Sequence, residues 1–142
     1  MRDVAQFFKV LSDEARLKIL WLLFHHLELC VCDIMGALGI TQSKASRHLI
    51  TMKHAGLVTD RREATWSYYS LSADVAGLER AMLATLRRSL GEHAGATGTL
   101  RDLQMWLQKK ERGGACEPKA CRPTSARGST NRKRTSGKGG KR

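Results

Sequence analysis

Residues 31–56 read VCDIMGALGITQSKASRHLITMKHAG, and this stretch decides the fold. Its apolar spacing predicts a short helix over about 33–38, which ends at Gly39 because glycine tolerates the left-handed backbone of a helix C-terminus. Thr41 is a suitable N-cap for a second helix that runs to about His54. The stretch therefore predicts two helices joined by a tight turn.

The second of these helices has one apolar and one polar face. Leu49 and Met52 share a side with Ala45, whereas Arg47 points the opposite way together with Ser43. A short helix, a tight turn and such a second helix form the helix-turn-helix pattern, in which the second helix lies in a DNA major groove. Gln and Arg can contact base edges, and Ser and Lys suit phosphates. The candidate DNA-binding residues in its N-terminal half are Gln42, Ser43, Lys44, Ser46, Arg47 and His48.

Residues 57–71 follow this helix and predict a β-hairpin. The second arm, WSYYSL over 66–71, is rich in aromatic residues that favour strands, and the charged tip carries Arg61 and Arg62. A basic hairpin in this place can reach the neighbouring DNA backbone or minor groove. An ordinary solvated surface helix is the alternative for the polar face, and the hairpin shifts the balance to DNA binding.

The remaining pattern predicts a mainly α fold with a small β-hairpin, a winged helix-turn-helix. Apolar spacing indicates further helices over about 4–11, 13–26, 73–90 and 99–112, with an interruption over 91–98. We expect residues 1–112 to form one DNA-binding and dimerisation domain. Residues 113–142 hold almost nothing apolar, so we expect a disordered basic tail.

The composition limits the class of function. The chain has 142 residues and a formal charge of +12, and residues 113–142 supply nine Lys and Arg against one acid. A basic excess suits polyanions such as nucleic acid. No apolar stretch approaches the roughly 18 residues of a membrane span, and the N-terminus is unlike a signal peptide. We expect a soluble cytoplasmic protein that does not contact a membrane.

Cys30 and Cys32 precede the predicted helix over 33–38, and a reducing cytosol would keep them as thiols. Soft ions prefer thiolate ligands, and the helix dipole is expected to lower a thiol pKa at this position. Thiols at i and i+2 diverge on a helix but share a side on an extended segment, so chelation requires non-helical backbone at Cys30. Two partly buried structural cysteines are the alternative.

Several segments together resemble the ArsR (ArsR/SmtB) family of metalloregulatory repressors, over about residues 5–90. They are ELCVCDI over 28–34, TQSKASRHL over 41–49, GLV over 56–58, Arg61 with Arg62, and WSYYSL over 66–71. The resemblance is to the arsenic-responsive type. It implies a homodimer built on the first and fifth helices, which binds a palindromic double-stranded operator and leaves it when As(III) or Sb(III) binds the cysteines.

Two departures bear on this resemblance. Arsenic-responsive members usually have a third cysteine where Met35 stands, and the wing tip commonly has glycine where Ala64 stands. Trivalent arsenic favours three soft ligands, so Cys116, Cys121 or an exogenous thiol or water would complete the site, while Met35 is better interpreted as a core residue.

Other signals remain open for the same fold. Zinc is disfavoured because the helix expected over 74–90 has no histidine, whereas cadmium, lead or bismuth ions, or oxidation of the cysteines, are alternatives. The chain has no phosphate-binding or dinucleotide-binding motif and no persuasive catalytic constellation, so we expect neither an enzyme nor an organic cofactor.

Overall fold

The computed structural model describes residues 1–112. The predicted disordered tail, with Cys116 and Cys121, lies outside the described residues. The elements in chain order are α1 (Arg2–Leu11), α2 (Glu14–His25), β1 (Leu29–Cys30), α3 (Val31–Leu38), α4 (Gln42–His54), β2 (Val58–Glu63), β3 (Trp66–Leu71), α5 (Gly77–Gly91) and α6 (Ala94–Glu111).

The helix-turn-helix has the local signals that the sequence predicts. The Thr41 hydroxyl caps α4 by accepting a hydrogen bond from the Lys44 N–H at 3.3 Å. Gly39 ends α3 with a φ of 64°, the left-handed conformation that glycine adopts without steric cost. The Asp13 carboxylate caps α2 in the same way, accepting from the Arg16 N–H at 3.0 Å.

The sheet contains the expected hairpin and one additional short strand. The strand order is β1-β3-β2, and both pairs are antiparallel. Cys30 lies opposite Tyr68 of β3, and Tyr68 lies opposite Arg61 of β2, so the three residues form one row across the sheet. Ala64 turns the wing tip with a φ of 52°, a conformation in which an alanine is strained. Direct pairing therefore connects the cysteine segment to the wing.

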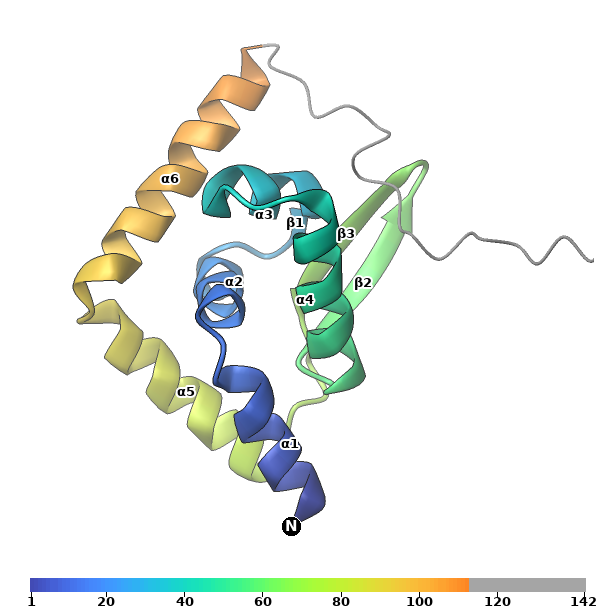
Figure 1. Cartoon of the computed structure of the whole chain (residues 1–142), viewed down its shortest axis with the longest axis vertical. Helices are drawn as coiled ribbons and strands as arrows, with labels where there is room; N and C mark the ends of the chain where they lie inside the picture. The colour runs from blue at the N-terminus through green and yellow to red at the C-terminus, as the bar shows by residue number, and fades with distance from the viewer. Residues whose placement is uncertain (113–142) are drawn as a thin grey trace, which may run out of the picture.

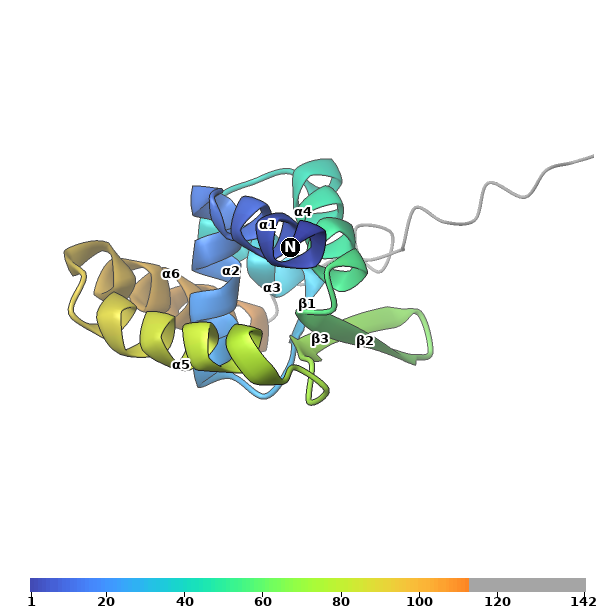
Figure 2. The same cartoon turned by 90° about the horizontal axis from the view of Figure 1, so that it is seen from below.

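The helices enclose one hydrophobic core around α2. Its fully buried side chains include Ile19, Leu20 and Leu22 of α2 and Ile34 of α3. In Figure 1, α3 lies between α6 on one side and α4 on the other. Figure 2 shows α5 and α6 as a layer on the side opposite to the β2–β3 wing. Among the described residues, no helix is long and apolar enough to cross a membrane.

The last two helices differ from the predicted pattern. The expected interruption over 91–98 is confined to the turn between α5 and α6, because α6 already begins at Ala94 and includes Gly95. The His93 ring accepts a hydrogen bond from the Gly95 N–H at 3.2 Å, and the Trp21 indole donates to the Ala96 carbonyl at 2.8 Å. These contacts stabilise a helix start that local propensity disfavours.

Candidate functional site

The two cysteines lie together at the start of α3. Cys30 is the N-cap, with an extended backbone (φ −81°, ψ 165°), and Cys32 lies in the first helical turn. The two are only 0% and 3% exposed and belong to one small cluster with Trp66, Tyr68 and Trp106. Cys30 thus has the non-helical backbone that chelation by this pair requires. Val31 already begins the helix, two residues earlier than predicted.

Asp33 connects this cysteine pair to the last helix. The residue is 4% exposed, and its carboxylate accepts at Oδ2 from both the backbone N–H and the thiol of Cys30, each at 3.1 Å. Its Oδ1 accepts from the Trp106 indole at 3.2 Å and from the Lys110 ammonium at 2.9 Å. The carboxylate therefore has four donors, two of them from α6.

The charges around Cys30 do not favour its thiolate. Burial raises the pKa of Cys30 first, and the neighbouring Asp33 carboxylate raises it further, while Lys110 only partly offsets both. The expectation that the helix N-terminus lowers this thiol pKa is therefore wrong for Cys30. Burial alone would lower the pKa of Lys110, but its hydrogen bond and ion pair with Asp33 outweigh burial and raise that pKa.

The third soft donor is not found within residues 1–112. Met35 packs against the main hydrophobic core rather than in the cysteine cluster, in agreement with its interpretation as a core residue. In the part of the chain that the structure describes, no group of three or more His, Cys, Asp or Glu side chains is arranged to hold a metal ion. Cys116 and Cys121 lie outside that part.

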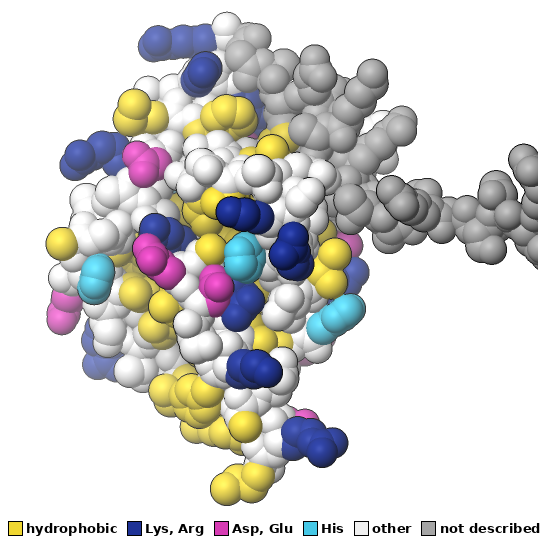
Figure 3. Space-filling view, viewed as in Figure 1, with side chains coloured by type: hydrophobic (Ala, Val, Ile, Leu, Met, Phe, Trp, Pro, Cys, Tyr) yellow, Lys and Arg dark blue, Asp and Glu magenta, His cyan; other side chains and the backbone are white. Residues whose placement is uncertain are grey.

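Helix α4 presents most of its predicted polar residues to solvent. Ser43, Lys44 and Arg47 are exposed, and Gln42 and His48 are half-buried. Ser46 differs, since it is 7% exposed and faces the core, so we leave it out of the proposed DNA surface. Figure 3 shows Lys, Arg and His side chains spread over the face that includes α4, with acidic side chains among them.

The two wing arginines have different surroundings. The Arg61 guanidinium pairs with Glu28 through Nη2 at 2.6 Å and Nε at 3.2 Å, and with Glu63 through Nη1 at 2.8 Å. It also lies 4.9 Å from the centre of the Tyr68 ring. Arg62 is exposed near the tip of the hairpin. Two carboxylates thus compensate the charge of Arg61 and hold it toward the segment that precedes Cys30.

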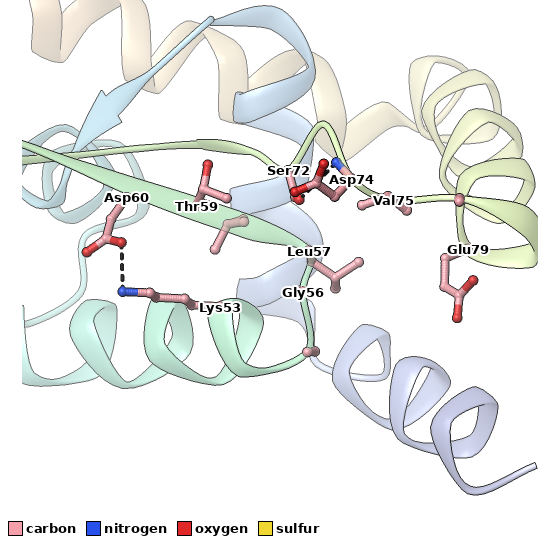
Figure 4. Close-up of a pocket in the computed structure, with 12 residues that line it drawn as sticks. Lys53, Gly56, Leu57, Thr59, Asp60, Ser72, Asp74, Val75 and Glu79 are labelled. Atoms are coloured by element: carbon pink, nitrogen blue, oxygen red, sulfur yellow. Dashed lines mark hydrogen bonds and ion pairs between the residues drawn. The ribbon is translucent and has the colours of Figure 1, made fainter.

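A pocket lies where the end of α4, β2 and the start of α5 meet (Figure 4). Within it, the Lys53 ammonium of α4 lies 2.7 Å from the Asp60 carboxylate of β2, and this hydrogen bond raises the pKa of Lys53. The ion pair connects the end of α4 to the first strand of the wing. The pocket shares no lining residue with the cysteine cluster.

Sequence patterns did not single out Asp33, Trp106 or Lys110. Asp33 had one available signal, its position three residues after the N-cap, where a carboxylate can accept from the N-cap N–H. The two α6 residues are 73 and 77 positions away from Asp33, and no local pattern connects residues at that separation.

These elements define a winged helix-turn-helix protein. Solved structures of that architecture resemble the chain at 33% identity. HlyU from Vibrio cholerae N16961 has a TM-score of 0.54 over 61% of this chain and 90% of its own. The homodimeric winged helix-turn-helix domain Mb0332 from Mycobacterium bovis, a possible ArsR-family regulator, has a TM-score of 0.55 over 66% and 82%.

The family model described as "Bacterial regulatory protein, arsR family" matches residues 13–60. The arsenical resistance operon repressor of Bacillus subtilis (strain 168) is 40% identical over 93 residues, which are 65% of this chain and 89% of that protein. The chain belongs to the ArsR family of bacterial regulatory proteins.

For two further relatives, this chain matches a smaller share of the relative's length. The arsenical resistance operon repressor of Escherichia coli (strain K12) is 47% identical over 49% of this chain and 60% of that protein. A cadmium resistance transcriptional regulatory protein, the CadC homolog of Staphylococcus aureus, is 44% identical over 49% and 57%. The relatives named here are transcriptional regulators, not enzymes.

Proposed function

We propose that this protein is a cytoplasmic transcriptional repressor that binds operator DNA as a homodimer and dissociates when As(III) or Sb(III) binds Cys30 and Cys32. One observation carries the proposal: the two cysteines share one cluster at the start of α3, and α3 packs against α4. A soft ion bound there acts at one end of the helix pair whose other end faces DNA. The arsenical resistance repressors among the relatives support the metalloid as the signal.

The DNA surface consists of α4 and the wing. The exposed N-terminal half of α4 would approach base edges and phosphates in the major groove, and Arg62 would reach the adjacent backbone. The proposed DNA-binding residues are Gln42, Ser43, Lys44, Arg47, His48 and Arg62, with Arg61 placing the wing.

Dimerisation would use α1 and α5. Phe8 of α1 and Leu78 of α5 are large apolar side chains that are 45% and 46% exposed in the single chain. Figure 1 shows α1 and the first turns of α5 at the same end of the domain, and Figure 2 shows them in separate layers. A dimer would present two copies of α4 to a palindromic operator.

Release follows from the chemistry of the thiols. Each As–S bond replaces one As–OH group of arsenite, and the thiol proton leaves with that hydroxide as water. A thiol that is bonded to the ion no longer donates to Asp33, so the hydrogen bond from the Cys30 thiol to the Asp33 carboxylate is lost, while the Cys30 N–H that caps α3 remains a donor. A coupling free energy of about 1–3 kcal/mol between ion and DNA would change operator affinity roughly 5- to 150-fold. Cys116, Cys121 or a small exogenous thiol would supply the third sulfur.

A cadmium-type divalent ion is the second candidate signal, because a cadmium resistance regulator is among the relatives. Cadmium also favours thiolate ligands, and Asp33 would add an oxygen donor beside Cys30.

The test is operator binding measured by fluorescence anisotropy, on a duplex selected from a random pool, in reducing buffer. Arsenite, antimonite, cadmium, zinc and peroxide are titrated separately against wild type and Cys32→Ser. We expect arsenite and antimonite to release wild type and to leave Cys32→Ser bound with unchanged starting affinity. Release by cadmium or peroxide alone would replace the signal, and failure of the unliganded protein to bind any selected duplex would contradict the repressor.

A further inference from the structure

Helix α6 covers the cysteine pair, although it lies outside the segment that matches the family model. Its C-terminal half packs along α3, and α3 in turn packs on α4 (Figure 1). Cys30 and Cys32 are 0% and 3% exposed with α6 in this position. The Cys30 sulfur, 3.6 Å from the Lys110 ammonium of α6, is therefore not open to solvent.

The Trp106 side chain of α6 packs most tightly against α3. A Cβ atom built on Gly36 would lie 2.1 Å from Cδ2 of the Trp106 ring, so the indole rests directly on the backbone of α3. The same ring contacts the cysteine cluster, and its Nε1 donates to Asp33. Any side chain at position 36 would displace this ring.

Lys110 holds the next turn of α6. Its ammonium lies 2.9 Å from Oδ1 of Asp33, 3.6 Å from the Cys30 sulfur and 5.9 Å from the centre of the Trp66 ring. The Lys110 side chain is 32% exposed, so the outer side of this contact already faces solvent. Trp106 and Lys110 therefore attach one face of α6 to a single buried carboxylate.

We propose that the C-terminal turns of α6, residues 105–111, form a lid that must withdraw from α3 before a thiol-binding ion reaches Cys30 and Cys32. This proposal rests on the proposed function in that it names the step that controls access to the same site. Trp106 and Lys110 keep the lid closed, and Gly36 provides the space in which Trp106 lies. Withdrawal of the lid frees α3 on the side opposite to α4, so the same motion that admits the ion loosens the support of the recognition helix.

The test uses the full chain with Cys116→Ser and Cys121→Ser, fully reduced, so that Cys30 and Cys32 are the only thiols. The rate of their reaction with 4,4′-dithiodipyridine is measured by stopped flow in this background and in Trp106→Ala, Gly36→Ala and Lys110→Met. Met105→Ala is the matched control, because Met105 is on the same helix and 62% exposed. We expect Trp106→Ala and Gly36→Ala to react about tenfold faster or more, Lys110→Met several-fold faster, and Met105→Ala at the background rate.

A rival route leads past the wing, where Trp66 covers the same cluster. Equal rates in all α6 variants, or an acceleration confined to Trp66→Ala, would overturn the lid. Hydrogen exchange keeps the test decisive if a variant fails to fold: in the unsubstituted protein with arsenite bound, the amides in 105–111 should lose their protection, and unchanged protection in the arsenite-bound protein would also overturn the lid.

Arsenite binding in Trp106→Ala, Gly36→Ala and Lys110→Met proteins that keep Cys116 and Cys121 separates the two proposals. Faster thiol reaction without any arsenite binding would uphold the lid and remove the proposed signal. Arsenite binding at one rate in every variant would uphold the signal and remove the lid.

Discussion

The side of α4 that we propose to face DNA and the cysteine site are both polar regions of one small domain, but their polar groups differ in what they contact. On α4, Ser43, Lys44 and Arg47 point into solvent. At the cysteine site, the Asp33 carboxylate accepts four hydrogen bonds from within the fold, and both cysteines are buried. One region is ready for its partner, whereas the other must exchange internal contacts for the ligand. Under the proposed function, we expect such a protein to bind DNA without ligand and to respond only to a ligand with enough affinity to break those contacts.

The largest effect should come from the buried carboxylate. Asp33→Ala leaves the Cys30 N–H, the Trp106 indole and the Lys110 ammonium without their shared acceptor, and should lower the free energy of unfolding by about 3 kcal/mol. Urea unfolding followed by circular dichroism measures it. Asp102→Ala is the control, since Asp102 is exposed on α6. A loss below about 1 kcal/mol would mean that the carboxylate is not the centre of this site.

Arg47→Ala should affect DNA binding and not stability, in contrast to Asp33→Ala. Because Arg47 is exposed on α4, its loss should leave the unfolding free energy unchanged and weaken operator binding about tenfold or more. Arg101→Ala, an exposed arginine on α6, serves as the control for the loss of one positive charge. Equal weakening by both variants would show a nonspecific charge effect and not contact by α4.

In the wing, the same difference between solvent-exposed and internally paired polar groups separates two neighbouring residues, Arg62 and Arg61. Arg62→Ala should reduce operator affinity a few-fold and lower the log–log salt slope by about 0.9, as expected for one lost phosphate contact. Arg61→Ala should change the salt slope less, because Glu28 and Glu63 already compensate that charge. Anisotropy titrations at several salt concentrations compare the two. Identical slopes would place both arginines on DNA.

The smallest effect concerns pH. The pKa of Cys30 is raised in the folded state, so the unfolded chain loses this proton first as the pH rises. The contribution of Cys30 to stability is fully present below the unfolded thiol pKa of about 8.5 and is lost as the pH rises through the higher folded pKa. Between pH 7 and pH 10, the free energy of unfolding should fall more for wild type than for Cys30→Ser. An equal fall in both proteins would contradict the raised pKa.

The helix-turn-helix and the polar face of α4 were predictable from the sequence because the residues that determine them are close together in the chain. The Thr41 cap, the Gly39 turn and the faces of α4 each depend on residues within a few positions of one another. Ser46 is the exception, since it sits close enough to Ala45 on the helix to be buried with it. For this residue, polarity alone did not indicate that the side chain is buried.

The closed state of the cysteine site was not predictable in the same way. The C-x-C motif and its non-helical start were visible in the sequence, but the side chains packed around Cys30 include Trp106 and Lys110, which come from the far end of the described chain. The position of α6 depends in turn on a helix start that includes Gly95, where propensity predicts an interruption. Local patterns therefore locate the thiols but do not give their exposure or their pKa.

The contact between Gly36 and Trp106 has a consequence for how such chains can diverge. Because the ring occupies the space of the missing Cβ, a mutation to any larger residue at position 36 is tolerated only together with a smaller residue at 106 or a displaced α6. The two positions should therefore change as a pair among descendants of this sequence. Those that keep glycine and tryptophan should keep the covered site, whereas those that lose both should have thiols open to solvent.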